Sequence, residues 1–417
     1  MALLSAPAGD TLPKLLRERA ALHPRRVALR EKEFGIWQRV TWADYLGHAR
    51  RFCLGLQALG VARGDKVAIL SENRREWLYA ELGAMAAGAV GVGVYPTSPA
   101  NEVRYVVDHS EAVAVVAEDQ EQVDKILSVA LPRVRHVIVP EPRGLRRYRD
   151  PRLVPFAEVL ALGARHCEAH PGRFDELVSA TRADDAAFLI YTSGTTGFPK
   201  GAMISHRNVL AQARAVTEAV GFGPGDSVVS YLPLCHVAEQ IFSVFLPLWL
   251  GMTVNFAESL RTIQEDLREI APTVFLGVPR IWEKLQASIL VKIQETGRLR
   301  RWLFERAVAG GRRLAEKRLS GRRAGALDLA GEALRFLLVG RALQNFVGLR
   351  RARLTFSAAA AISPEVLAFF HALGIPVREG YGMTECTGFS FVQRRGEVRL
   401  GTVGRAIPGL EFRLAPD

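Results

Sequence analysis

Short apolar runs alternate with helical patterns along this chain, and this alternation limits the possible folds more than any other feature. The runs Lys66–Leu70 ("KVAIL"), Val90–Val94 ("VGVGV") and 112–118 ("AVAVVAE") have the length of strands. Helical patterns lie between them, at Glu76–Gly88 and at 99–110. Strands that are apolar on both faces and joined by helices predict a parallel sheet that is covered on two sides.

The pattern recurs further along the chain, which predicts an α/β fold with two wound α/β lobes. The later strand-like runs are "AAFLIYT" (186–192), "VVSYLPL" (228–234), "MTVNF" (252–256), "TVFLG" (273–277) and "RLTFS" (353–357). A turn-rich stretch, Arg395–Asp417, predicts the start of a small β subdomain. The approximate lobes that we expect are 1–180, 181–350 and 351–417.

The basic charge of the chain is local. Lysine and arginine number 55 against 43 acidic residues, a formal charge of +12, and the segment Arg298–Arg353 alone contains 15 basic and 4 acidic residues. Nucleic-acid binding is not expected, because no recognisable module or interleaved stacking aromatics accompany the charge.

The chain has the character of a cytosolic protein. Its four cysteines are scattered without metal-ligand or CxxC spacing, and its N-terminus lacks the basic start of a signal peptide. The longest mostly apolar run, Ile241–Val254, has 14 residues and contains Pro247, whereas a spanning helix needs about 20. We therefore expect a cytoplasmic protein that at most rests on a membrane surface.

A glycine-rich stretch, "YTSGTTGFPKG" (Tyr191–Gly201), follows one of these strands. Gly194 and Gly197 permit positive φ, the hydroxyl residues add donors, and Lys200 adds a positive charge. Ser205 is placed to cap a helix that follows and ends at Gly221. A strand, a glycine loop and a helix in succession favour phosphate binding. The residues around Lys200 are not those of a Walker A loop, because proline precedes the lysine and glycine follows it.

This stretch closely resembles the signature loop of the adenylate-forming superfamily, which includes acyl-CoA synthetases, luciferases and nonribosomal adenylation domains. Further family motifs follow in the expected order: "YLPLCHVAEQ" (231–240), "SAAAAIS" (357–363), "REGYGMTEC" (378–386) and "GTVGRAIPG" (401–409). The resemblance covers essentially 1–417, which would be the large AMP-binding N-terminal domain.

The resemblance implies roles for individual residues. Lys200 with the preceding loop would hold the β- and γ-phosphates of ATP, and Thr384 would contact the α-phosphate. Tyr381 would stack on adenine, with its flanking glycines leaving one ring face open. Residues expected to bind the nucleotide are Thr192, Ser193, Gly194, Thr195, Thr196, Gly197, Ala358, Ala359, Glu379, Gly380, Tyr381, Gly382, Met383 and Thr384. Ser193 and Glu385 would lie near Mg²⁺, since carboxylate and hydroxyl oxygens suit that ion.

The acyl substrate is expected near His236. The family places this position beside the acyl carboxylate, although a single histidine can equally be a core residue. Val237, Gln240 and Gly277 are expected to line the same pocket. We therefore expect Lys200, Thr384, Glu385 and His236 to take part in catalysis.

The reaction implied is attack of a carboxylate on the α-phosphorus of ATP, which gives an acyl-adenylate and pyrophosphate, followed by thioester formation with coenzyme A. "GVPRIWEKL" (Gly277–Leu285) resembles the segment typical of long-chain and bubblegum-type fatty acyl-CoA synthetases. A medium-chain or aryl acid remains an alternative substrate, and a non-catalytic nucleotide- or acyl-binding protein is an alternative of another class.

The basic segment Arg298–Arg323 contains Trp302, Leu303 and Phe304 among its arginines. One hypothesis is that this face rests on an anionic membrane. The alternative is a solvated helical surface, because the Gly310–Gly311 pair predicts an interruption of a long helix.

The chain also departs from the family pattern. Family members continue with a segment whose aspartate binds the ribose and with a small mobile C-terminal domain that carries a lysine for adenylation. Neither lies within these 417 residues, and alanines replace a usual glycine and proline in 357–363. We therefore expect the chain to bind ATP weakly and to turn over slowly or not at all.

Overall fold

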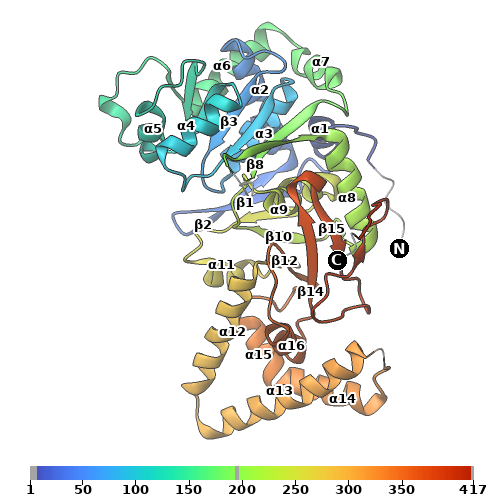
Figure 1. Ribbon diagram of the computed structural model, residues 1–417. Coiled ribbons are helices and arrows are strands. Elements are labelled where there is room, and N and C mark those ends of the chain that lie inside the picture. The colour runs from blue at the N-terminus through green and yellow to red at the C-terminus, as the bar shows by residue number, and fades with distance from the viewer. Residues whose placement is uncertain (1–6, 193–196, 321, 415–417) are drawn as a thin grey trace. The chain divides into compact units, whose positions relative to one another are not determined.

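The structure, a computed structural model, describes residues 7–192, 197–320 and 322–414 (Figure 1). Packing divides the chain into two compact units: unit 1 comprises Met1–Ala213 and Ser230–Phe256, and unit 2 comprises Arg214–Val229 and Ala257–Asp417. These units are interleaved in the sequence, whereas the lobes expected at 1–180, 181–350 and 351–417 are contiguous. The expected lobe division therefore stays a prediction.

The elements of unit 1, with the two that the unit boundary crosses (α8 and β10), are as follows: α1 (Leu12–Leu22), β1 (Val27–Glu33), β2 (Ile36–Thr41), α2 (Trp42–Ala58), β3 (Lys66–Leu70), α3 (Arg75–Ala86), β4 (Val90–Val94), α4 (Ala100–His109), β5 (Ala112–Ala117), α5 (Gln120–Leu127), β6 (His136–Val139), η1 (Leu145–Arg147), β7 (Leu153–Pro155), α6 (Phe156–Ala169), α7 (Arg173–Ala180), β8 (Ala186–Thr192), β9 (Lys200–Ser205), α8 (His206–Val220), β10 (Ser227–Ser230), α9 (Val237–Gln240), η2 (Ile241–Phe245), α10 (Leu246–Leu250) and β11 (Thr253–Phe256).

The elements of unit 2 are as follows: α11 (Ile263–Ile270), β12 (Val274–Gly277), α12 (Pro279–Gln294), α13 (Arg298–Leu319), α14 (Ala326–Arg335), η3 (Phe336–Gly340), α15 (Arg341–Phe346), β13 (Leu354–Ser357), α16 (Pro364–Ala372), β14 (Val377–Met383), η4 (Thr384–Cys386), β15 (Gly388–Val392) and β16 (Arg405–Ala406).

A seven-stranded sheet organises unit 1, with the order β7-β6-β5-β3-β4-β8-β9. Its strands are parallel except for β9, which runs antiparallel to β8. Helices α4 and α5 cover one face, while α2, α3 and α6 pack together on the other (Figure 1). The predicted parallel sheet covered on two sides is thus confirmed. Because strands are added on both sides of β3, the carboxyl ends of β3 and β5 form a switch point, the usual place for a site in such sheets.

Strand β9 corrects the prediction for the stretch after the glycine loop. The sequence predicted that the loop leads directly into a helix, but β9 lies between them and pairs with β8. Within the short run Lys200–Ser205, Met203 is exposed and the next residue, Ile204, is buried, because successive side chains of a strand point to opposite faces. Helix α8 then begins as predicted, with Ser205 Oγ accepting a hydrogen bond from the backbone N–H of Asn208 at 3.2 Å.

The central sheet of unit 2 has the order β12-β13-β14-β15-β16. Strands β12, β13 and β14 are parallel, and β15 and β16 continue the sheet in antiparallel fashion. The short strand β16 lies in the turn-rich stretch where the sequence predicted a small β region. Gly277 ends β12, Ala358 directly follows β13, and the segment 379–385 comprises the last residues of β14 and the start of η4, so this sheet positions the second group of candidate site residues.

Helix α13 runs without interruption through the Gly310–Gly311 pair, so the interruption expected there is wrong. The reason is tertiary packing against α16: a Cβ on Gly311 would lie 2.0 Å from the backbone oxygen of Ala372. A side chain at this position would push the two helices apart, so the glycine permits a close helix–helix approach that outweighs its low helix propensity.

Among the described helices, none combines the length and the apolar character that crossing a lipid bilayer requires.

Candidate functional site

The glycine stretch forms the connection of a β-hairpin in unit 1. Thr192 ends β8 and Lys200 begins β9, and the two residues lie opposite each other in the strand ladder. The predicted phosphate-binding residues Ser193, Gly194, Thr195 and Thr196 lie outside the described residues. Gly197 has a φ of 101°, which favours glycine as the sequence predicted. The exposed Lys200 therefore stands at the base of the loop.

Helix α4 supports this hairpin from one side. The ring of Tyr105 stacks on Phe198 at a centroid distance of 4.9 Å, and its hydroxyl donates to the backbone oxygen of Pro199 at 3.0 Å. One turn later on the same helix, His109 Nδ1 lies 2.9 Å from the hydroxyl of Tyr191. Tyr191 of β8 and the segment Phe198–Pro199, just before β9, are thus both tied to α4, and these contacts were not predicted from the sequence.

His236 caps a short helix in the same unit. Its Nδ1 accepts a hydrogen bond from the backbone N–H of Ala238 at 3.1 Å, at the N-terminus of α9. Burial lowers the pKa of His236, which favours the neutral ring. Because Nδ1 is an acceptor in this contact, the neutral ring carries its proton on Nε2. The side chain can therefore offer an N–H donor to an oxygen ligand.

Val237 and Gln240, which the sequence placed near the acyl group, are both buried. The Gln240 Nε2 donates to the backbone oxygen of Leu234 at 2.8 Å and to Glu81 Oε2 at 3.2 Å. Glu81 also accepts from Trp77 Nε1 at 3.0 Å. Burial raises the pKa of Glu81 to about 8, although these two hydrogen bonds oppose the shift. Gln240 therefore links α9 to a neutral carboxyl on α3.

Asn73 holds the loop that precedes His236. Its Oδ1 accepts from the backbone N–H of Leu234 at 3.1 Å, and its Nδ2 donates to the Leu232 oxygen at 2.6 Å and to Ser230 Oγ at 2.9 Å. Asn73 follows β3, at the switch point of the sheet. The side chain of Asn73 therefore satisfies backbone groups of Leu232 and Leu234, in the loop that leads into His236.

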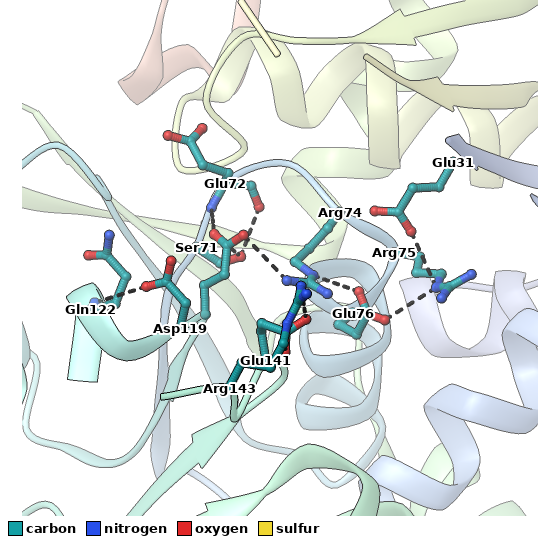
Figure 2. Close-up of polar contacts among 11 residues, drawn as sticks. Glu31, Ser71, Glu72, Arg74, Arg75, Glu76, Asp119, Gln122, Glu141 and Arg143 are labelled. Carbon is teal, nitrogen blue, oxygen red and sulfur yellow. Dashed lines mark hydrogen bonds and ion pairs between the residues drawn. The ribbon is translucent and has the colours of Figure 1, made fainter. Parts of the chain in front are cut away.

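The loop that carries Asn73 is itself fixed by a network of ion pairs (Figure 2). Arg74 Nε lies 2.7 Å from Glu76 Oε2, and Arg74 Nη1 lies 3.3 Å from Glu118 Oε1, just after β5. Glu118 also accepts from the backbone N–H of Glu72 at 2.6 Å and from Ser71 Oγ at 3.2 Å. The carboxyl ends of β3 and β5 are thus joined by charged hydrogen bonds on both sides of Asn73.

The network extends to β1 through a second arginine. Arg75 Nε lies 3.2 Å from Glu76 Oε1 and 3.2 Å from Glu31 Oε2, as Figure 2 shows. Burial and the neighbouring Glu76 raise the pKa of Glu31 to about 7, whereas Arg74 and Arg75 outweigh burial at Glu76 and lower its pKa. Since both arginines engage carboxylates, the network fixes the loop and provides no free cationic site for phosphate.

The second group of candidate residues lies in unit 2, on β14. Gly380 and Gly382 flank Tyr381, and from the sequence we expect them to keep one face of its ring open. The structure gives a further reason for both glycines: a Cβ on Gly380 would lie 2.3 Å from the ring of Phe389, and a Cβ on Gly382 would lie 1.9 Å from the oxygen of Gly388. They allow β15 to pack closely on β14. Tyr381 is about half exposed, and Met383 is exposed as well.

Two buried polar side chains belong to residues that are paired on adjacent strands of unit 2. Ser357 and Glu379 are partners in the β13–β14 ladder. Ser357 Oγ and Glu379 Oε2 have no hydrogen-bond partner among the described residues, and burial raises the pKa of Glu379. Unsatisfied buried polar groups cost free energy and commonly mark a ligand site. Thr384 is buried and Glu385 exposed on η4, directly after this strand.

The residues after β13 adopt a strained backbone. Ala359 has a φ of 75°, in the left-handed region that L side chains rarely adopt. Strain of this kind tends to occur at ligand-binding positions. Ala358 is half-buried and Ala359 exposed, so both are reachable by a ligand.

Gly277, at the end of β12, is held by a tryptophan that was not among the predicted site residues. Trp282 Nε1 donates to the backbone oxygen of Gly277 at 3.0 Å and to that of Phe356 at 3.1 Å. Trp282 is fully buried, and a Cβ on Gly277 would lie 2.6 Å from its Nε1. The indole therefore joins the carboxyl ends of β12 and β13. The quoted segment "GVPRIWEKL" contained this residue, so the signal was present in the sequence.

Comparison with known proteins agrees with this geometry. The family described as AMP-binding enzyme matches residues 16–417. The chain is 34% identical over 419 residues to long-chain-fatty-acid–CoA ligase ACSBG2 of Rattus norvegicus, which covers 97% of this chain and 61% of that protein. The chain thus spans about three fifths of this relative's length.

Solved structures share the fold. The anthranilate CoA ligase AuaEII in complex with anthranoyl-AMP matches with a TM-score of 0.74 and 20% identity, covering 99% of this chain and 67% of that one. The N-terminal domain of FACL13 from Mycobacterium tuberculosis matches with a TM-score of 0.65 and 22% identity, covering 95% of this chain and 82% of that one.

The wound α/β units with glycine segments at strand ends define a protein with the fold of CoA ligases, which confirms the predicted fold class. The chain belongs to the AMP-binding enzyme family. The expected resemblance to long-chain, bubblegum-type synthetases is also confirmed.

Proposed function

We propose that this chain provides the nucleotide- and acyl-binding part of an AMP-forming long-chain fatty acid–CoA ligase. In the first step a fatty acid carboxylate attacks the α-phosphorus of ATP, and pyrophosphate leaves. In the second step the thiol of coenzyme A attacks the acyl carbonyl, and AMP leaves as the thioester forms. The observation that carries this proposal is the 34% identity, over 97% of the chain, to a protein named as a long-chain fatty acid–CoA ligase.

The residues of unit 1 would position the phosphates and the acid. Lys200, at the base of the glycine hairpin, would place a positive charge near the β- and γ-phosphates together with Thr192 and Gly197. His236 would donate from Nε2 to the acid carboxylate, since its Nδ1 already accepts a backbone N–H. Such a reaction depends on in-line placement and on cancellation of charge, so preorganised donors supply most of the catalysis.

The residues of unit 2 would hold the nucleoside and the α-phosphate. The half-exposed Tyr381 would stack on adenine, and Ala358 and Ala359 would lie along the base. The unpartnered oxygen of Glu379 is suited to accept a hydrogen bond from the exocyclic amine of adenine. Thr384 would contact the α-phosphate, and Gly277 would border the acyl pocket.

Magnesium fits this set of residues as an ion that arrives with the nucleotide. Within the described parts of the chain, no three histidine, cysteine or acidic side chains gather as a metal site. Glu385 offers one exposed carboxylate, and Mg²⁺ in phosphate sites commonly takes one or two protein carboxylates and keeps several waters. When bound, the ion would neutralise phosphate charge; Ser193, the other predicted ligand, lies outside the described residues.

We also propose a cytoplasmic protein that contacts a membrane peripherally, through the basic segment Arg298–Arg323. Most of the net charge of the chain is concentrated in and just after this segment. Long-chain acids partition into bilayers, so a ligase of this class would meet its substrate there.

The proposal is tested by ligand-dependent thermal shifts followed by pyrophosphate exchange. The chain is heated with and without ATP and Mg²⁺, in the presence of saturated acids of increasing length and of benzoate. We expect an increase in melting temperature with ATP and Mg²⁺, and a further increase that is largest for long-chain acids. The variant Lys200→Ala should lose most of the ATP-dependent shift.

The competing functions give different results. A maximal response to medium-chain acids or to benzoate would identify the alternative ligase class. Ligand-dependent shifts without pyrophosphate exchange, in this chain and in a longer protein that contains it, would favour a binding protein without catalysis. No shift with ATP under any condition would contradict both.

A further inference from the structure

Helix α14 and the following η3 expose a row of large apolar side chains in unit 2. Leu327 is 90% exposed, Leu337 64%, Leu334 58% and Leu338 57%. We call these four residues the leucine surface. Leu329 and Phe336 on the same segment are also exposed. Apolar side chains that occur singly at a surface need no explanation, but a contiguous patch of this kind commonly marks an interaction site.

The polar side of α14 faces inward, toward α13. Asp328 forms an ion pair with Lys317, and Glu332 pairs with Arg318 at 2.7 Å. A helix packed on a soluble core usually buries its apolar side and exposes its charges. Here the ion pairs hold the acidic side of α14 against α13, and the leucine surface is left outside. The orientation is therefore set by specific contacts.

A groove between α13 and the α14–η3 segment continues this surface. Trp302, Arg306 and Arg313 of α13 line it together with Leu334 and Leu338. The guanidinium of Arg306 lies over the ring of the half-exposed Trp302, 5.4 Å from its centroid. An aromatic ring beside cationic and aliphatic side chains is the combination found where proteins enter the interfacial region of a bilayer.

The charge around the leucine surface is strongly positive. Residues 298–341 contain twelve basic and four acidic residues, a net charge of +8, and two of the four acids are the ones already paired with α13. The exposed basic residues of this segment are Arg298, Arg300, Arg301, Arg306, Arg312, Arg313, Arg318, Arg322, Arg323 and Arg341. A second copy of the chain would bring two such surfaces of like charge together, which disfavours self-association.

We propose that the leucine surface inserts into the interfacial region of an anionic lipid bilayer, while the arginines of α13 contact its headgroups. Apolar insertion and electrostatic attraction together give stable peripheral binding where either alone is weak. This deepens the membrane contact proposed above, because it moves the inserting residues from Arg298–Arg323 to α14 and η3. It does not rest on the ligase reaction.

The experiment is co-sedimentation of the chain with vesicles, without substrate. Vesicles of phosphatidylcholine alone are compared with an equimolar mixture of phosphatidylcholine and phosphatidylglycerol. We expect binding to the anionic vesicles only, and weaker binding as salt is raised. The triple variant Leu334→Gln, Leu337→Gln, Leu338→Gln should lower the partition coefficient at least about tenfold. The double variant Arg306→Gln, Arg313→Gln should lower it by about tenfold or more.

Matched controls separate the surface from general changes in the chain. Leu22→Gln and Leu260→Gln replace leucines of similar exposure elsewhere, and Arg146→Gln with Arg147→Gln removes two exposed arginines of unit 1. These variants should bind as the parent does. Since all replaced side chains are exposed, we expect melting temperatures close to that of the parent. The melting temperature of each variant therefore serves as the check that it is folded.

Three results would overturn the proposal. One is equal pelleting with neutral and anionic vesicles, and another is unchanged pelleting of the triple leucine variant. A third is light scattering that shows an oligomer in solution which the triple variant dissociates, with no vesicle binding by either protein; the leucine surface would then be a self-association interface. Because no substrate is present, none of these results bears on whether the chain activates fatty acids.

Discussion

The side-chain amide of Asn73 donates a hydrogen bond to the backbone oxygen of Leu232 at 2.6 Å, across 159 positions of the sequence. This contact joins the carboxyl end of β3 to the loop that leads into His236. The side-chain oxygen of Asn73 accepts a hydrogen bond from the backbone N–H of Leu234. A short polar loop at the switch point of the sheet therefore sets the path of a segment that we expect to contact the acyl group.

Replacing Asn73 with alanine should weaken fatty acid binding more than ATP binding. The change leaves the Leu232 oxygen and the Leu234 N–H without their partner, which costs about 1–3 kcal/mol for each group that stays buried. The loop would then relax and move His236, whereas the glycine hairpin would keep its own contacts with α4. The measurement is the thermal shift induced separately by a long-chain acid and by ATP with Mg²⁺.

Two further variants test whether Asn73 acts through the loop. Asn73→Asp keeps an acceptor for Leu234 but loses both donors, so an intermediate effect on acid binding is expected. Ser71→Ala removes a hydrogen bond to Glu118 and none to the His236 loop, so it should lower stability slightly and leave acid binding unchanged. Equal loss of acid and ATP binding in Asn73→Ala would point to a purely structural role.

The buried carboxyl of Glu81 should make stability depend on pH. Burial raises its pKa to about 8, so the folded protein keeps a proton that the unfolded chain releases at lower pH. The contribution of Glu81 is full below the pKa of the unfolded chain and is lost as pH rises through the folded pKa. Between about pH 4.5 and about pH 8 the free energy of unfolding should therefore fall by ~1.4 kcal/mol per pH unit from this group.

Glu81→Gln removes this dependence and keeps a side chain of similar size. The difference in unfolding free energy between the parent and the variant, measured with urea at several pH values, should change steadily across that interval in favour of the variant. Glu239, whose pKa burial raises to about 7, is present in both proteins, so its contribution cancels in the difference. A difference that stays constant with pH would show that Glu81 is ionised when folded.

The parallel strands could be predicted because they must be buried on both faces. Runs such as Lys66–Leu70 and Ala112–Ala117 have almost no polar residues. Such runs are typical of strands in a parallel sheet whose two faces are both covered by helices. Strand β9 was missed because its run is short and half polar, and because its partner β8 lies on the other side of the glycine stretch. The position of the candidate loop was thus predictable, while its geometry as a hairpin was not.

The supporting residues of the site were harder to predict, because their partners lie far away in the sequence. Asn73 stands in the polar run "SENRR" directly after a strand, and the rule that ligands lie at strand carboxyl ends could have flagged it. However, no pattern in the neighbouring sequence predicts that Asn73 forms hydrogen bonds with Leu232 and Leu234. Gly380 and Gly382 were explained from the sequence by ligand access, which stays a prediction, and the structure adds that a Cβ at either position would clash with residues of β15.

Trp282→Phe should weaken ATP binding at the candidate adenine site while keeping an aromatic side chain in the core. Phenylalanine keeps an aromatic ring but loses the indole N–H that reaches the oxygens of both Gly277 and Phe356. Two buried acceptors would lose a donor, and with the smaller ring we expect a loss of about 2–4 kcal/mol in unfolding free energy. ATP binding should weaken as the ends of β12 and β13 loosen. The half-exposed Trp302 is the control, and Trp302→Phe should leave stability and ATP binding unchanged.

Ala359→Gly tests whether the strained backbone after β13 is part of the site. Relief of the left-handed conformation should stabilise the chain by up to about 1 kcal/mol, after the greater chain entropy of glycine is deducted. Ala360→Gly is the matched control, since Ala360 is equally exposed and has no positive φ. It should lower stability by roughly 0.5–1 kcal/mol. If both variants are destabilised equally in thermal unfolding, Ala359 is not strained in solution.

Adjacent glycines in α13 provide a last prediction with a built-in comparison. Gly311→Ala would place a Cβ 2.0 Å from the Ala372 oxygen, and that atom belongs to the backbone of α16 and cannot move freely. We expect a loss of about 1–3 kcal/mol, because overpacking forces the helices apart. Gly310→Ala meets only the flexible side chain of Arg335 at 3.2 Å, so the gain in helix propensity, about 1 kcal/mol, should prevail. Opposite shifts in melting temperature for the two variants would show that α13 packs on α16 through Gly311. Equal shifts in the same direction would mean that both glycines affect only the helix propensity of α13 and that Gly311 makes no close contact with α16.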